Sequence, residues 1–154
     1  MILELFEINF ERLLSEKSIM VGLDVGDKTI GISVSDARLK IASGVTTLIR
    51  KGSDVQKLLE ILSSYKVGLF VVGWPIQMNG IAGSQCEKVQ NFIEELETQT
   101  SVPIVKWDER FSTRVVDSVL IAANVSRKRR KQYVDKIAAV YILQGALDYF
   151  ENRR

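Results

Sequence analysis

The stretch IMVGLDVGDKTIGISVSD, residues 19–36, decides the fold. An apolar, strand-like run at residues 19–25 is followed by the turn residues GDK and by a second strand-like run at residues 29–36. This spacing predicts an antiparallel hairpin. One carboxylate, Asp24, lies inside the first apolar run. Because a buried carboxylate without a partner loses its hydration at a high cost in free energy, Asp24 calls for a structural or chemical role.

The patterns that follow extend the hairpin into an α/β domain. β-Branched residues predict a third strand, and apolar residues at helical spacing predict helices between further strands. After the hairpin, the predicted elements are a strand at 44–51, a helix within 53–66, a strand at 67–74, a helix within 84–100, a strand at 102–110, a short helix at 112–124 and a long helix at 130–150. This order indicates a meander that enters a parallel sheet through right-handed crossovers.

Length and composition indicate one soluble globular domain. The chain has 154 residues, of which 46% are hydrophobic and 26% charged. We expect a single domain at 19–154, preceded by an extension at 1–18 whose leucines and Ile8 could form a docked amphipathic helix. No apolar run reaches the roughly 18 residues that span a bilayer, and the start lacks a basic signal region. We therefore expect a cytoplasmic protein.

Two residue types are nearly absent, and this narrows the chemistry. Cys86 is the only cysteine and there is no histidine. An intrachain disulfide, a cysteine-based zinc site and every histidine-dependent nucleophilic scheme are therefore excluded. An enzyme built from this chain must work with carboxylates, lysines, hydroxyl groups or bound metal ions.

The charge is small overall but unevenly distributed. The net charge is +2, yet residues 1–103 hold 10 basic and 13 acidic residues, whereas residues 104–154 hold 11 and 6. The basic excess concentrates in SRKRRK, residues 126–131. This block is a candidate phosphate-binding patch, and the alternative is a solvated loop between helices.

Carboxylates gather where a site is expected. Asp24 lies toward the end of the first strand, Asp108 and Glu109 close the strand at 102–110, and Asp135 lies near the start of the long final helix. In open α/β sheets, sites form at the carboxyl ends of the strands. Small alanines three and four positions after Asp135 would let that helix approach the sheet closely.

Clustered carboxylates repel one another, and divalent cations resolve that conflict. Hard oxygen ligands suit Mg²⁺ or Mn²⁺, and paired ions of this kind catalyse phosphoryl displacement. Each residue also has an ordinary alternative: Asp24 could cap the turn, Asp108 and Glu109 could form surface ion pairs, and Asp135 could be a first-turn helix acid. Their positions at matching ends of elements favour the site.

The sequence resembles the YqgF/RuvX family of RNase H-like nucleases, described as Holliday-junction resolvases or pre-16S rRNA nucleases. The resemblance runs from about residue 20 to residue 150 and rests on GLDVGDKTIGISVSD, VVGWPIQMNG, DERFST and SRKRRKQYVDKIAAVYILQ. It implies an RNase H-like fold with a five-stranded mixed sheet, in which strand two is antiparallel. Trp74 departs from the family pattern, in which a smaller aliphatic residue is expected.

The resemblance also implies a catalytic metal site for Mg²⁺ or Mn²⁺. Its ligands would be Asp24, an acid at the end of the fifth strand and Asp135. Glu109 is the preferred acid of that strand, with Asp108 as the alternative.

Several further residues fit a nucleic-acid substrate. Trp74 or Trp107, if exposed, could stack on a base, although tryptophan is more commonly buried. The candidate phosphate contacts are Lys28, Arg110, Arg114, Arg127, Lys128, Arg129, Arg130 and Lys131.

The sequence thus predicts a metal-dependent nuclease that acts on structured nucleic acid, with pre-16S rRNA as the first candidate substrate and a branched DNA junction as the second. Two rival functions remain. The hairpin also resembles that of actin-like ATPases, which need two such domains, and a non-catalytic RNA-binding assembly factor could keep the same fold. The oligomeric state, monomer or homodimer, stays open.

Overall fold

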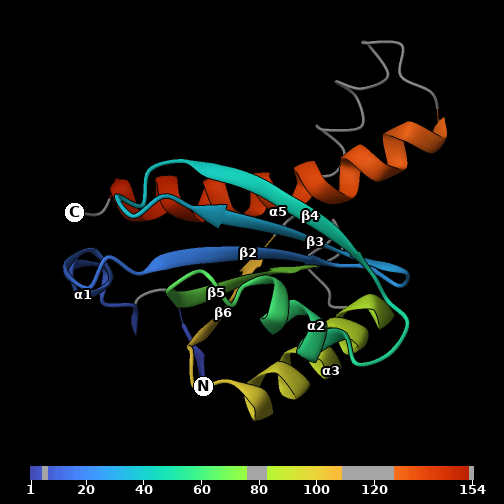
Figure 1. The fold of residues 1–154 in the computed structure, drawn as a ribbon, viewed down its shortest axis with the longest axis horizontal. Coiled ribbons are helices and arrows are strands. Elements are labelled where there is room, and N and C mark those ends of the chain that lie inside the picture. The colour runs from blue at the N-terminus through green and yellow to red at the C-terminus, as the bar shows by residue number, and fades with distance from the viewer. Residues whose placement is uncertain (5–6, 76–82, 109–126, 153–154) are drawn as a thin grey trace.

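In a computed structural model, the chain forms a mixed sheet between helices (Figure 1). The structure describes residues 1–4, 7–75, 83–108 and 127–152, and for residues 127–136 it describes the backbone only. Helix α5 (Arg127–Glu151) covers one face of the sheet, and helices α2 (Asp54–Ile61) and α3 (Ser84–Gln99) cover the other. The short helix α1 (Phe10–Ser15) lies at one end of the sheet.

Within the described residues, the sheet has six strands in the order β1-β6-β5-β2-β3-β4. Their bounds are β1 Ile2–Leu3, β2 Ile19–Val25, β3 Thr29–Ser35, β4 Ala42–Ile49, β5 Val67–Trp74 and β6 Ile104–Asp108. The pairs β2–β3 and β3–β4 are antiparallel, whereas β2–β5, β5–β6 and β1–β6 are parallel. The predicted hairpin, meander and mixed sheet are confirmed. The sixth strand, β1, was not predicted, because it is only two residues long.

Strand alternation divides the core into two layers. In β2 and β3, the residues that face α2 and α3 are Ile19, Val21, Leu23, Val25, Ile30, Ile32 and Val34. The residues between them face α5 and are mostly small or polar, because successive side chains point to opposite faces of a sheet. The same hairpin therefore offers a bulky aliphatic surface on one side and a shallow one on the other.

The shallow surface lets α5 lie very close to the sheet. A methyl group added at Gly22 would come within 2.7 Å of Leu143 Cβ and 2.8 Å of the Ala139 carbonyl oxygen. The buried hydroxyl of Ser33 donates a hydrogen bond of 2.7 Å to that same carbonyl. Because nothing larger fits between them, Gly22 and Ser33 set the height of α5 above the sheet.

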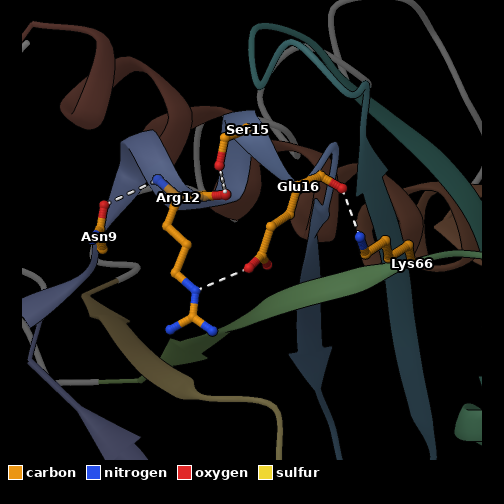
Figure 2. Close-up of polar contacts among 5 residues, drawn as sticks. All are labelled: Asn9, Arg12, Ser15, Glu16 and Lys66. Carbon is orange, nitrogen blue, oxygen red and sulfur yellow. Dashed lines mark hydrogen bonds and ion pairs between the residues drawn. The ribbon is translucent and has the colours of Figure 1, made fainter.

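The N-terminal extension is docked on the domain. β1 pairs with β6, and the Phe10 ring of α1 lies 5.4 Å from the Phe150 ring at the end of α5. Figure 2 shows how α1 is held: the side chain of Asn9 caps it, and Lys66 Nζ donates a hydrogen bond of 2.7 Å to the carbonyl of Glu16. The extension therefore contributes a strand and a helix to the fold.

The final helix begins earlier than predicted. α5 starts at Arg127, so the backbone of the basic block forms its first turns and is not a loop between helices. The predicted helix at 112–124 lies outside the described residues. In the described parts of the chain, no helix is long and apolar enough to cross a membrane.

Candidate active site

Asp24 lies near the end of β2, on the face that α5 covers. It is half-buried and follows Met20 and Gly22 at two-residue spacing, so its side chain leaves the sheet on the same side as theirs. Its partner on β3 is Gly31, and the register that pairs Leu23 with Val72 brings Gly73 of β5 beside it. Because both flanking residues are glycines, the two positions directly beside Asp24 on the sheet carry no side chain.

The N-terminal half of helix α5 lies toward this end of the sheet. Gln144 lies at the opposite end, where its side chain accepts a hydrogen bond from the Ala42 backbone N–H and donates one to the Lys40 carbonyl. Ala139 lies over Gly22, and position 135 is one helical turn nearer to the N-terminus. The backbone of α5 at Asp135 is therefore carried toward the Asp24 end of β2, as Figure 1 shows for the helix as a whole. The Asp135 side chain lies outside the description.

Asp108 ends β6 and points away from Asp24. Val105 and Trp107 pack in the layer under α5, whereas Ile104 packs in the layer under α3. Alternation then puts Lys106 and Asp108 on the α3 side. Of the two acids proposed for the end of this strand, Asp108 is thus disfavoured as a co-ligand of Asp24. Glu109 lies outside the described residues.

The turn that follows Asp24 is tied to the strand and helices around it. Arg50, at the end of β4, donates from Nη1 to the Gly26 carbonyl at 2.8 Å, and its backbone N–H donates to the Lys28 carbonyl at 2.9 Å. Its Nε also binds Asp54 Oδ2 at 3.0 Å. Sequence reasoning missed Arg50, because its role depends on tertiary contacts. These bonds hold the loop beside Asp24 in one conformation.

A surface ion pair adds to this anchoring. Lys88 Nζ lies 2.8 Å from Asp27 Oδ1 at the tip of the turn. The hydrogen bond and charge of Lys88 hold the pKa of the Asp27 carboxyl below its usual value. Lys28, the predicted phosphate contact in this turn, is exposed to solvent and lies four positions after Asp24. It is therefore accessible to a ligand at this end of the sheet.

Asp24 fits a hard divalent cation by its chemistry. Its carboxylate offers oxygen ligands, and it lies half-buried at the carboxyl end of a central strand. Among the described residues, no three acidic or cysteine side chains are grouped so that they could hold a metal ion. The side chains of Glu109 and Asp135 belong to the part that is not described, so Asp24 is the only one of the three preferred ligands whose side chain is described.

The two tryptophans occupy different places. Trp107 packs under α5. Its ring lies 5.9 Å from the Tyr149 ring, and a Cβ atom added at Gly145 would lie 3.1 Å from Trp107 Cζ2. Trp74 lies on the α3 side, with Lys106 Nζ 4.1 Å from its ring centroid. Both tryptophans are half-buried: Trp107 packs beneath α5, and Trp74 lies on the α3 side of the carboxyl edge.

The remaining predicted contacts are only partly visible. Arg110 and Arg114 lie outside the described residues. The block at residues 127–131 is helical, but its side chains are not described.

Comparisons with known proteins agree on the family. The family described as "RuvX: Holliday junction resolvase" matches residues 18–149. A protein of Thermoanaerobacter pseudethanolicus named "Putative pre-16S rRNA nuclease" is 46% identical over 137 residues, which cover 87% of this chain and 99% of that protein. A protein of Clostridium novyi with the same name is 47% identical over 131 residues, which cover 84% of this chain and 97% of that protein.

Among solved structures, "T. thermophilus RuvC in complex with Holliday junction substrate" matches with a TM-score of 0.49 and 14% identity, covering 86% of this chain and 96% of that one. The family match extends over most of the chain, and it begins where the N-terminal extension ends. The chain therefore belongs to the RuvX family.

Proposed function

We propose that this protein is a metal-dependent nuclease that hydrolyses phosphodiester bonds in structured nucleic acid. The observation that carries the proposal is the position of Asp24. It is a half-buried carboxylate at the carboxyl end of a central strand, flanked by glycines and facing the helix that bears Asp135. Sites in open α/β sheets form at this end of the strands.

In this proposal, the acidic residues hold the metal and Arg50 positions the turn beside them. Asp24, Glu109 and Asp135 would hold Mg²⁺ or Mn²⁺. A bound pair of such ions would supply activation of the attacking water and stabilisation of the charge on the phosphate and the leaving oxygen. Arg50 keeps the turn after Asp24 in place through its bond to the Gly26 carbonyl. The chain has no histidine to act as a general base.

Pre-16S rRNA is the first candidate substrate. Relatives that are 42–47% identical and match over most of their length carry the name "Putative pre-16S rRNA nuclease". A four-way DNA junction is the second candidate, because the matching family is described as a Holliday junction resolvase.

A side-by-side cleavage assay tests the proposal and ranks its substrates. Purified protein is incubated with pre-16S rRNA, single strands and four-way junctions, each in Mg²⁺, Mn²⁺, Ca²⁺ and EDTA. We expect cleavage in Mg²⁺ or Mn²⁺ and little in Ca²⁺, because the larger and looser coordination shell of Ca²⁺ positions the attacking water poorly. Cleavage that persists in EDTA would refute the metal-dependent mechanism. Binding without cleavage in Mn²⁺ would instead favour an RNA-binding assembly factor.

The basic block should supply affinity without reading sequence. Neutralising Arg129 and Arg130 together should weaken binding similarly for all substrates. It should also flatten the slope of log affinity against log salt by roughly 0.7–0.9 for each phosphate that is no longer neutralised. The measurement is a salt titration of binding in EDTA, with Lys57→Gln, a change in α2 on the other side of the sheet, as the control. An unchanged slope would show that the block does not bind phosphates.

A further inference from the structure

A cavity lies at the same edge of the sheet as Asp24, but on the α3 face of the sheet. It has a volume of about 500 Å³ and opens between the carboxyl ends of β5 and β6 and the first turns of α3. The strands contribute Trp74 and Lys106 to its lining, and the helix contributes Glu87, Gln90 and Asn91. Its volume lies within the range of small-ligand sites in proteins. Nothing in the nuclease mechanism uses this cavity.

Trp74 gives the cavity an aromatic surface that is held in place. Lys106 Nζ lies 4.1 Å from the centroid of its ring, a distance at which an ammonium group is attracted to the ring face. The two residues come from adjacent strands, and Trp74 also packs against the core under α3. A fixed indole that lines a cavity is a stacking surface for a planar ligand.

Gln90, which lines the cavity, has an unused hydrogen-bond acceptor. Its Nε2 donates to Glu94 Oε1 at 3.3 Å, so its Oε1 is left to accept. That oxygen is buried and has no donor in the part of the chain that the structure describes. A buried acceptor without a donor costs free energy, and a ligand N–H group would recover it.

The charges of the lining favour a neutral ligand. Lys106 and Glu87 carry opposite charges, so the cavity has no excess of positive charge that would draw in a phosphate. A planar, uncharged group with N–H donors matches an aromatic surface and a buried carbonyl oxygen. A nucleobase has these properties.

We propose that this cavity binds an unpaired nucleobase of the nucleic acid that the enzyme cleaves. The base stacks on Trp74 and donates an N–H group to Gln90 Oε1. Trp74 directly follows Gly73, which lies beside Asp24 on the other face of the edge. A strand that crosses this edge can therefore present a phosphate to Asp24 and a neighbouring base to Trp74. This proposal rests on the proposed nuclease function, whose substrate it narrows to one with an unpaired base near the cleaved bond.

Fluorescence gives a direct test, because the chain has only two tryptophans. In Trp107→Phe, the emission comes from Trp74 alone. This variant is titrated in EDTA with a single-stranded RNA oligonucleotide and with the same backbone lacking all bases. We expect saturable quenching with the base-carrying strand and none with the abasic strand. Circular dichroism of Trp107→Phe verifies that the fold is kept.

Affinity measurements give a second, independent test. Trp74→Ala should weaken binding of the base-carrying RNA by about 5- to 150-fold, the range measured when a stacking aromatic is removed. Binding of the abasic strand should not change. Trp74→Phe should restore most of the affinity, and Gln90→Leu should lower it with the same dependence on bases. Tyr65→Ala, a change at an exposed aromatic outside the cavity, is the matched control.

The outcomes separate this proposal from the nuclease proposal. The base site would be overturned if the variants lost equal affinity for base-carrying and abasic strands. Binding that leaves the Trp74 emission unquenched would also overturn it. A wild-type protein that binds no oligonucleotide would do the same. If wild-type protein still cleaves while the base site fails these tests, the nuclease proposal stands. If Trp74→Ala does not fold, the Gln90→Leu variant and the quenching experiment still test whether the cavity binds a base.

Discussion

The two faces of the β2–β3 hairpin are built from alternate residues of the same two strands, and they have different properties. Toward α2 and α3, the hairpin presents aliphatic side chains in an unbroken layer. Toward α5, it presents Gly22, Asp24, Gly31 and Ser33. One face contributes bulk to the core, and the other leaves room for a helix and a carboxylate.

The difference shows how a small domain can carry a charged site next to its core. Burial of the aliphatic layer supplies stability, because the free energy gained is roughly proportional to the apolar area removed from water. The α5 face gives up part of that area for a close backbone approach, with Ser33 bonded to the Ala139 carbonyl at 2.7 Å. We therefore expect substitutions on the two faces to affect different measurements.

The largest expected effect is on catalysis. Asp24→Asn should lower the cleavage rate on the order of 10³-fold, since removing one group that stabilises transition-state charge costs about 10²–10³ in rate. Nucleic-acid affinity should stay nearly unchanged. Any rise in melting temperature that Mg²⁺ or Mn²⁺ gives the wild-type protein should vanish, because the metal would no longer bind the folded state. The measurements are cleavage kinetics and thermal melts with and without metal.

Asp108→Asn is the matched control for this experiment. Asp108 lies at the same edge of the sheet but, by alternation, on the α3 side. Its loss should have a much smaller effect on the rate. Equal losses in the two variants would mean that Asp108 also acts at the catalytic site.

The next effect is on stability alone. Leu23 is fully buried in the layer under α2 and α3, and Leu23→Ala should lower the free energy of unfolding by about 2–5 kcal/mol. Cleavage by the protein that remains folded should be nearly normal. Urea denaturation and single-turnover cleavage at low temperature measure the two quantities. A loss of cleavage beyond the loss of folded protein would contradict the division between the faces.

Gly22→Ala, one position earlier, should affect both quantities. The added methyl group has no room under Ala139 and Leu143, so α5 must shift at a cost of about 1–3 kcal/mol. Because α5 also carries Asp135, the shift should lower the cleavage rate of the folded enzyme. Normal cleavage at reduced stability would show that the height of α5 does not matter for catalysis.

The smallest effect concerns the hairpin end farthest from Asp24. Burial alone would raise the pKa of Asp36, but the backbone N–H groups of Ile41 and Lys40 outweigh it and hold the pKa below 3.8. A lowered folded-state pKa adds stability above the unfolded-state pKa, and that stability is lost as the pH falls through the folded-state value. Since Asp36 is exposed, Asp36→Asn should cost less than about 1 kcal/mol near neutral pH. The difference should shrink in urea titrations below about pH 3.8.

Most of the sheet could be predicted from the sequence because its signals are local. The apolar runs of β2, β3 and β5 and the helical spacing of α3 each lie within one element. β1 could not be predicted, since two residues carry no periodicity and their partner strand lies far along the chain. β4 begins at Ala42, two residues before the predicted start, where the Gln144 side chain binds its backbone N–H.

Of the candidate site, the sequence predicts the position of Asp24. Asp24 stood out because a carboxylate interrupts an apolar strand, and its face follows from alternation. That Asp108 points to the other face also follows from alternation, but only once the packing of Ile104 and Val105 is known. The contacts of Arg50 and the stacking of Lys106 on Trp74 join segments that are distant in the sequence, so no local pattern predicts them.

The pairing of β1 with β6 has a consequence for how the protein is made. Ile2 is the partner of Ile104, so the first strand leaves the ribosome 102 residues before the strand that it joins. At synthesis rates of about 5–20 residues per second, this segment waits roughly 5–20 s without its partner. The β2–β4 meander can form meanwhile from neighbouring segments. The order of assembly thus differs from the order of translation, because β1 is made before the meander but can pair only after β6 has been made.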